Sequence, residues 1–310
     1  MKARSIVVGT ILALEFFSWG IGAGAILPDT VQCPLTVLHG RLYARAALQN
    51  QAQPNWWLVD TGSPWSLVDA NQARGLTQSN PVIRGQVATK DGRILPVLKG
   101  IGINIAGQAM GPFNFVKYPS LGAIDANRNS RVGYERPFQT GGVLGLNFLV
   151  QHRARFNFPA QSLFLTAGSG SSELGPARFE GFTAVPIQIT ATPRIEVFGS
   201  VGSRLYSFLV DTGSYRSVFD WKIKESNQIP VRPSGILYFG LVDRTVPTAM
   251  GDLENFKIGT LDVSKKFVEF ANLAGSVLGF SHPFGGIIGE DFLWAHQAIL
   301  DIARRTLYLK

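Results

Sequence analysis

The sequence predicts an all-β protein in which two related halves each form a barrel or a sandwich of short strands. Three observations predict this fold: short apolar runs between turn residues, two pairs of matching segments, and a Gly/Ser-rich stretch between the halves. The 310 residues are 45% hydrophobic and 16% charged. Such a chain is too apolar for disorder and long enough for one large core or two ordinary ones.

The first 25 residues are typical of an export signal. After a positive start, an apolar run covers residues 6–14, and Ala23-Gly24-Ala25 is a small-residue cleavage pattern. We expect residues 1–25 to be a signal peptide and the protein to be exported, either periplasmic or secreted. The alternative is an uncleaved membrane anchor at about 6–27, which would be the only contact with a membrane. Glu15 inside the apolar stretch disfavours it.

Two segments occur twice in the same order. Residues 57–63 are Trp-Leu-Val-Asp-Thr-Gly-Ser, and residues 208–214 are Phe-Leu-Val-Asp-Thr-Gly-Ser. Further along, residues 142–149 match residues 286–293 at nearly the same offset, and the match continues to the end of the chain. Because two independent segments match in this way, we interpret the chain as a duplicated domain.

A Gly/Ser-rich stretch without a periodic apolar face separates the two copies, and this composition is typical of a flexible linker. We therefore expect an N-terminal lobe at residues 26–166, a linker at 167–181 and a C-terminal lobe at 182–310. Each lobe has the usual size of a domain, about 100–150 residues.

Most expected elements are strands. Apolar and alternating runs predict strands at Arg41–Leu48 and at residues 100–105, 162–165, 184–189, 256–261 and 306–309. An Asp-Gly pair at residues 91–92 indicates a hairpin. Helices are expected only as two short segments, at residues 147–152 and 291–296.

The two aspartates of the repeat, Asp60 and Asp211, each stand between an apolar strand and a Thr-Gly turn. If the halves face each other about a pseudo-twofold axis, the two carboxylates meet and share a proton, because close carboxylates cannot both ionise easily. The charged carboxylate can then take a proton from water while the protonated one donates to a substrate carbonyl. This pattern favours attack of water on an amide, with no metal, cofactor or covalent intermediate.

The three residues after each aspartate are the candidate supporting loop: Thr61, Gly62, Ser63, Thr212, Gly213 and Ser214. The glycines allow backbone approaches that a Cβ would block. The threonine hydroxyls can bond to backbone across the interface. The serine hydroxyls either donate to the carboxylates, which would favour the charged form and lower the pKa of the pair, or only close the turn that follows each Thr-Gly.

Asp-Thr-Gly-Ser followed later by Gly-aliphatic-aliphatic-Gly, twice over, resembles the aspartic peptidase superfamily, in a bacterial form with two fused retropepsin-like domains. The resemblance implies two closed β-barrel lobes, the acid protease fold, with an active-site cleft between them. It also implies that Asp60 and Asp211 are the catalytic dyad, that the threonines lock the loops together, and that residues 142–145 and 286–289 pack under them. An extended polypeptide substrate would lie under a β-hairpin flap.

The chain departs from the pepsin-like pattern in three ways. The flap candidates, Thr89, Lys90, Asp91 and Gly92, include no aromatic residue, whereas pepsin-like enzymes carry a tyrosine there. Cys33 is the single cysteine, so no disulfide can form within the chain. Few residues separate the expected cleavage site from Asp60, and we therefore expect no zymogen step.

The expected function is an aspartic-type endopeptidase. The alternatives are a non-catalytic peptide-binding protein of the same fold and a dedicated processing protease for one envelope partner. We expect a monomer, and no nucleic-acid partner, because no aromatic-basic platform accompanies the net charge of +8. His152 and His296 occur at matching positions of the two copies, either as a metal pair or at a helix end in the core.

Overall fold

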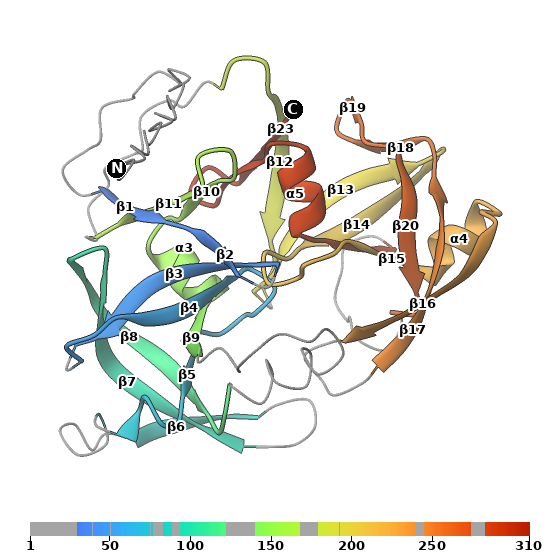
Figure 1. Cartoon of the computed structure of the whole chain (residues 1–310). Coiled ribbons are helices and arrows are strands. Elements are labelled where there is room, and N and C mark those ends of the chain that lie inside the picture. The colour runs from blue at the N-terminus through green and yellow to red at the C-terminus, as the bar shows by residue number, and fades with distance from the viewer. Residues whose placement is uncertain are drawn as a thin grey trace, which may run out of the picture.

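Short strands make up most of the chain and pair into two hydrogen-bonded sheets (Figure 1). The computed structural model describes residues 30–38, 40–49, 51–74, 76, 83–88, 94–121, 140–167, 179–191, 193–239, 245–273 and 283–310. The all-β prediction is confirmed, since the helices at residues 146–151, 221–226 and 290–295 are each only six residues long.

The first half contributes one sheet of eight strands and the short helix α3. The elements are β2 Thr36–Leu38, β3 Arg41–Leu48, β4 Asn55–Asp60, β5 Leu67–Asp69, β6 Ile83–Ala88, β7 Ile94–Ile105, β8 Gln108–Tyr118, β9 Thr140–Gly145 and α3 Leu146–Gln151.

Six of these strands close into a barrel. The order is β3-β4-β9-β5-β8-β7, and β7 pairs back with β3, where Ala46 lies opposite Ile105. Closure leaves these six strands without a free edge. Trp57 and Phe115 are buried in the core of this half and meet edge to face with ring centroids 5.6 Å apart.

The second half has its own set of strands and two short helices. The elements are β13 Ile195–Val201, β14 Arg204–Val210, β15 Val218–Asp220, α4 Trp221–Ser226, β16 Val231–Phe239, β17 Thr245–Leu253, β18 Phe256–Ile258, β19 Leu261–Asp262, β20 Lys265–Ala271, β21 Phe284–Ile288 and α5 Glu290–Ala295.

The strand order of the second half repeats that of the first. The path β13-β14-β21-β15-β20-β17-β16 corresponds to β3-β4-β9-β5-β8-β7-β6. The counterpart of β7 is interrupted, however: β17 ends at Leu253, Asn255 takes a left-handed φ of 54°, and a separate strand, β18, pairs with β13. The structure thus shows one closed barrel, and the second closed barrel stays a prediction.

A third set of strands joins the halves. It consists of β1 Thr30–Pro34, β10 Arg155–Asn157, β11 Ser162–Thr166, β12 Thr183–Ile189, β22 Ile299–Asp301 and β23 Thr306–Leu309.

These six strands run in the order β1-β11-β10-β22-β23-β12 and lie side by side between the halves in Figure 1. The first three come from the first half and the last three from the second, so the order is symmetric about the β10–β22 pair. At this junction Phe156 lies opposite Leu300, and both side chains are fully buried. Main-chain hydrogen bonds and a shared core therefore connect the two copies.

The structure confirms most of the expected elements. Strand Arg41–Leu48 has the expected bounds, and the two helices expected at residues 147–152 and 291–296 are α3 and α5. A third helix, α4, was not expected. Its N-terminus is capped by Asp220, whose carboxylate accepts the Lys222 N–H at 3.0 Å.

Several expectations fall on residues outside those described. They concern the signal peptide at 1–25, the turn of the hairpin at 89–93 and most of the linker, 168–178, so the domain bounds stay a prediction. On either side of that turn, β6 and β7 pair antiparallel, with Ala88 opposite Ile94. Within the described residues, no helix is long and apolar enough to cross a membrane.

Phe156→Ala tests the junction between the halves. We expect the free energy of unfolding to fall by about 3–5 kcal/mol, because a fully buried ring is replaced by a cavity. Urea denaturation measures the change. The control Phe267→Ala removes a ring that is 61% exposed and should change stability by less than about 0.5 kcal/mol. An equal effect of the two substitutions would contradict the assigned core.

Candidate active site

The two Asp-Thr-Gly loops bond to each other across the interface. The Thr61 hydroxyl donates to the Val210 carbonyl at 2.8 Å, and the Thr212 hydroxyl donates to the Val59 carbonyl at 2.7 Å. Each hydroxyl also accepts the backbone N–H of the other threonine at 3.0 Å. Both threonines are fully buried, so these four bonds are shielded from water. The expected hydroxyl-to-backbone bonds across the interface are present.

This contact brings the two aspartates together. The carboxyl groups of Asp60 and Asp211 are hydrogen bonded to each other. Each expected glycine lies against the carboxyl of the opposite half, because a Cβ on Gly62 would collide with Asp211 and a Cβ on Gly213 would collide with Asp60. The glycines are therefore required by the close approach of two loops.

Burial raises the pKa of both carboxyl groups. For Asp211 the pKa is well above its usual range, first through desolvation and then through the negative charge and hydrogen bond of Asp60. For Asp60 desolvation also raises the pKa, while the hydrogen bond from Asp211 opposes the rise. Arg41 lowers the pKa of both through its positive charge. The pair titrates as one unit and retains a proton where an ordinary aspartate is ionised.

Backbone donors distinguish the two carboxyl groups. Oδ1 of Asp60 accepts the N–H of Gly62 at 2.8 Å and of Ser63 at 3.1 Å. Oδ1 of Asp211 accepts the N–H of Gly213 at 2.9 Å. Because N–H donors stabilise the charged form, the extra donor favours Asp60 as the ionised member and Asp211 as the protonated one.

Of the two roles that the sequence left open for the serine hydroxyls, the structure shows the turn role. The Ser63 hydroxyl donates to the Trp65 carbonyl at 2.8 Å, and the Ser214 hydroxyl donates to the Arg216 carbonyl at 2.9 Å. A hydroxyl has one proton, so it does not also donate to the carboxylate. The serines instead close the turn after each Thr-Gly, and it is the Ser63 backbone N–H that reaches Asp60.

A glycine strand and a short helix support each loop from below. Strand β9 runs parallel to β4, and β21 runs parallel to β14. The helices that follow donate to the loops: Leu146 N–H reaches the Ser63 carbonyl and Glu290 N–H reaches the Ser214 carbonyl, both at 2.8 Å. A Cβ on Gly145 would collide with the backbone of Trp65. The packing of these segments under the loops matches what the family resemblance implied.

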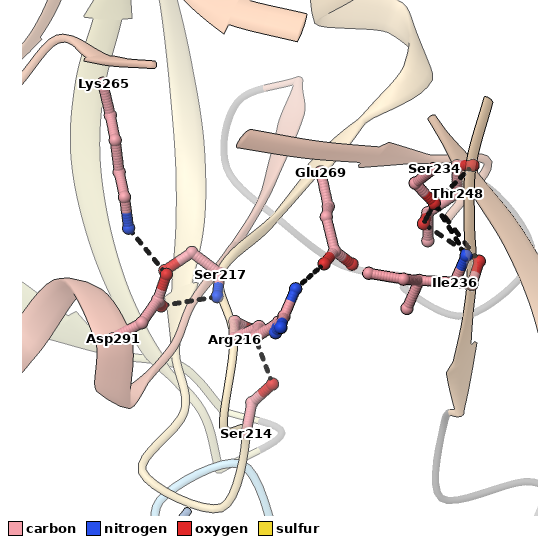
Figure 2. A network of polar contacts seen from close by, with 9 residues as sticks. All are labelled: Ser214, Arg216, Ser217, Ser234, Ile236, Thr248, Lys265, Glu269 and Asp291. Carbon is pink, nitrogen blue, oxygen red and sulfur yellow. Dashed lines mark hydrogen bonds and ion pairs between the residues drawn. The ribbon is translucent and has the colours of Figure 1, made fainter. Parts of the chain in front are cut away.

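A second layer of side chains had not been assigned from the sequence. In the first half, Asn147 Oδ1 accepts the Ser66 N–H at 2.8 Å and the Ser66 hydroxyl at 2.9 Å. In the second half, Asp291 Oδ1 accepts the corresponding groups of Ser217, both at 2.7 Å (Figure 2). The recurrence of these residues at matching positions of the two copies was the sequence signal that could have identified them.

The two loops differ at the residue two positions after the loop serine. The first has Trp65, whose side chain is 45% exposed, and the second has Arg216, which forms an ion pair with the buried Glu269 (Figure 2). Beside Arg216, Tyr215 is 53% exposed. Of the three tryptophans near Asp60, Trp57 is buried, Trp56 is half-buried and Trp65 is exposed.

The paired histidines cap the ends of their helices. His152 Nδ1 contacts the Thr166 carbonyl at 2.9 Å, and His296 Nδ1 contacts the Lys310 carbonyl at 3.4 Å. Burial lowers the pKa of both rings. The helix-end interpretation is confirmed, and within the described ranges no group of three or more His, Cys, Asp or Glu side chains is arranged to hold a metal.

Two cavities lined by described residues lie away from the aspartates. The larger, about 640 Å³, is formed within the second half and includes Arg232, Asp252 and Phe267. The smaller, about 370 Å³, is formed within the first half and includes Gln51 and Asn104. The flap candidates, Thr89 to Gly92, lie outside the described residues, and a substrate cleft is therefore a proposal.

Comparison with known proteins finds no relative by sequence: no model of a known family matches the chain, and no curated protein does. Among solved structures, the chain is similar to the crystal structure of basic 7S globulin from soybean. The two are 12% identical with a TM-score of 0.49, over 91% of this chain and 95% of that chain. So weak a likeness carries no argument, and the proposals below rest on the contacts of the aspartate loops.

Thr61→Val tests the contact between the loops. The change leaves the Val210 carbonyl and the Thr212 N–H buried without their partner, and each loss should cost about 1–3 kcal/mol of stability. Chemical denaturation measures the change. The control Thr61→Ser keeps the hydroxyl and should cost clearly less. If valine and serine destabilise equally, the cross-bonds are not what stabilises the interface.

Proposed function

We propose that the chain is an aspartic-type endopeptidase that hydrolyses peptide bonds with water activated between Asp60 and Asp211. One observation carries the proposal: two carboxyl groups, one from each copy of the repeat, are hydrogen bonded to each other, with Asp60 buried and Asp211 half-buried. Such a pair holds one proton and one negative charge over a wide pH range, which is the requirement for an acid and a base in one site.

The asymmetry of the pair assigns the two roles. Asp60, the ionised member, accepts a proton from a water molecule while the water oxygen attacks the peptide carbonyl carbon. Asp211, the protonated member, donates its hydrogen to the carbonyl oxygen, so that the intermediate is a neutral diol. The proton taken up by Asp60 then passes to the leaving nitrogen, the C–N bond breaks, and Asp211 recovers its proton from the diol. All atoms and charges balance, and no covalent enzyme intermediate forms.

The surroundings support these roles. The backbone N–H groups of Gly62 and Ser63 stabilise negative charge on Asp60, while burial of Asp211 opposes loss of its proton. The threonine bonds hold the loops in register, which matters because misplacement of reacting groups by about 1 Å can cost roughly 100-fold in rate. A turn with a purely structural role would not need two carboxyl groups held in this arrangement.

The proposal places the chain in the aspartic peptidase superfamily as a two-lobed monomer that is exported. The substrate is an extended polypeptide that lies between the halves and bonds mainly through its main chain. A peptide-binding protein without turnover and a processing protease for a single partner keep the same loops. The presence of both aspartates, with their donors, favours an enzyme over the binding protein.

Asp60→Asn tests the assignment of the dyad. We expect kcat/KM on an unfolded protein substrate to fall by at least about 100-fold, because the base is lost. Cleavage is measured from pH 3 to 7, where wild-type activity should rise as the pair loses its first proton. It should fall only above the usual carboxyl range, since burial raises the pKa of Asp211.

Asp262→Asn serves as the matched control, because Asp262 lies in β19 with an exposed carboxyl group, and this variant should keep full activity. Survival of activity in Asp60→Asn would rule out the dyad mechanism. An inactive wild type at every pH, with tight peptide binding, would assign the chain to the binding proteins.

Ser63→Ala and Ser214→Ala test the turn role of the serines. Because these hydroxyls donate to the Trp65 and Arg216 carbonyls, neither substitution should move the pH of maximal activity. Both should lower thermal stability, since a part-buried carbonyl loses its donor. A rise of the optimum by half a pH unit or more would restore the role in which the hydroxyls donate to the carboxylates.

A further inference from the structure

The two copies of the repeat differ at the first residue of the supporting helix. The first copy has Leu146, which is fully buried and apolar, and the second has Glu290, whose side chain is also buried at 2% exposed. Both residues donate their backbone N–H to the aspartate loop of their own half. An ionisable group has thus replaced a core leucine directly beneath one of the two loops.

The Glu290 carboxyl reaches the other half of the molecule. Its Oε1 accepts the backbone N–H of Leu42, in strand β3 of the first half, at 2.7 Å. Leu42 is 1% exposed, so this N–H is shielded from water and needs a partner. Together with the bond from Glu290 N–H to the Ser214 carbonyl at 2.8 Å, one residue ties strand β3 to the loop that carries Asp211.

The groups that interact with this carboxyl come from three elements. Arg41 belongs to β3, Asp211 to the facing loop, and Trp294 to helix α5 itself, while the neighbouring Asp291 is paired with Lys265 at 2.7 Å. Burial raises the pKa of Glu290 to about 8, and the charge of Asp211 adds to the rise. The Leu42 N–H, the Trp294 side chain and Arg41 oppose it. At neutral pH the carboxyl is therefore mostly protonated.

We propose that Glu290 is a positioning residue whose neutral carboxyl holds the Asp211 loop against strand β3 of the opposite half. This inference rests on the proposed function of the aspartate pair and adds to it a residue that acts through Asp211 without touching the substrate. The threonine hydrogen bonds join the two loops to each other, and the bond from the Leu42 N–H to Glu290 attaches the Asp211 side of the site to strand β3.

The protonation state of Glu290 is linked to stability with a definite sign. Its pKa is higher in the folded chain than in the unfolded chain, where an ordinary glutamate has a pKa of about 4.3. The folded state then binds the proton more tightly, so stability falls as the pH rises from the unfolded value to about 8. A glutamine at this position keeps the acceptor and does not ionise, so it should not show this loss.

Two substitutions distinguish the role of the Glu290 side chain as a hydrogen-bond acceptor from the role of its charge. Glu290→Gln retains an oxygen for the Leu42 N–H, whereas Glu290→Leu reproduces the residue of the first copy and leaves that N–H unpartnered. The matched controls are Glu225→Gln and Glu225→Leu on the exposed face of helix α4.

The first measurement is peptide hydrolysis at pH 5. We expect Glu290→Gln to keep kcat and KM within about threefold of wild type, because both carry a neutral acceptor. Glu290→Leu should lower kcat by about tenfold or more with KM within about threefold, since the Asp211 loop is displaced. The Glu225 variants should match wild type. A wild-type kcat in Glu290→Leu would overturn the proposal.

The second measurement is thermal unfolding at pH 5 and pH 9. It needs no substrate, and it requires only that Glu290→Gln folds. Glu290→Gln should unfold at the wild-type temperature at pH 5 and at least about 3 °C above it at pH 9. An equal difference at both pH values would overturn the role of the neutral carboxyl. Because these scans do not depend on catalysis, an inactive wild type with the expected shift would reject the peptidase and keep the Glu290 contact.

Discussion

Four buried hydrogen bonds made by two threonine hydroxyls are the constraint on which the rest of the site depends. Each hydroxyl of Thr61 and Thr212 donates to a carbonyl of the opposite half and accepts an N–H from it. This contact brings the two carboxyl groups into hydrogen-bonding distance. Desolvation, and then the negative charge of Asp60, raise the pKa of Asp211.

The supporting structure is symmetric in its backbone and asymmetric in its side chains. Both halves use a parallel glycine strand, a short helix and a serine that bonds to the next layer. The side chains differ where Leu146 is matched by Glu290 and where Trp65 is matched by Arg216. The two copies thus share the bonds that hold the loops together, while the surroundings of the two aspartates differ.

Much of the fold was predictable because the two copies of the repeat can be aligned with each other. Matching segments located both aspartates, both short helices and most strands, including Arg41–Leu48 with the observed bounds. Helix α4 was missed because its six residues have no counterpart in the repeat pattern, and a capping aspartate decides its start. The sequence left the serine role open because a hydroxyl beside a carboxylate in sequence can equally turn to a backbone carbonyl two residues away.

Residue types and their spacing were sufficient to determine the duplication, the all-β class and the identity of the facing aspartates, since these follow from local pattern and repetition. Tertiary packing decided the partners of each polar group. The bond from Leu42 to Glu290 joins residues 248 positions apart, and no local propensity encodes such a contact. Burial likewise raises the pKa of Glu290 and of the two aspartates, because desolvation depends on everything that surrounds a carboxyl group in the folded chain.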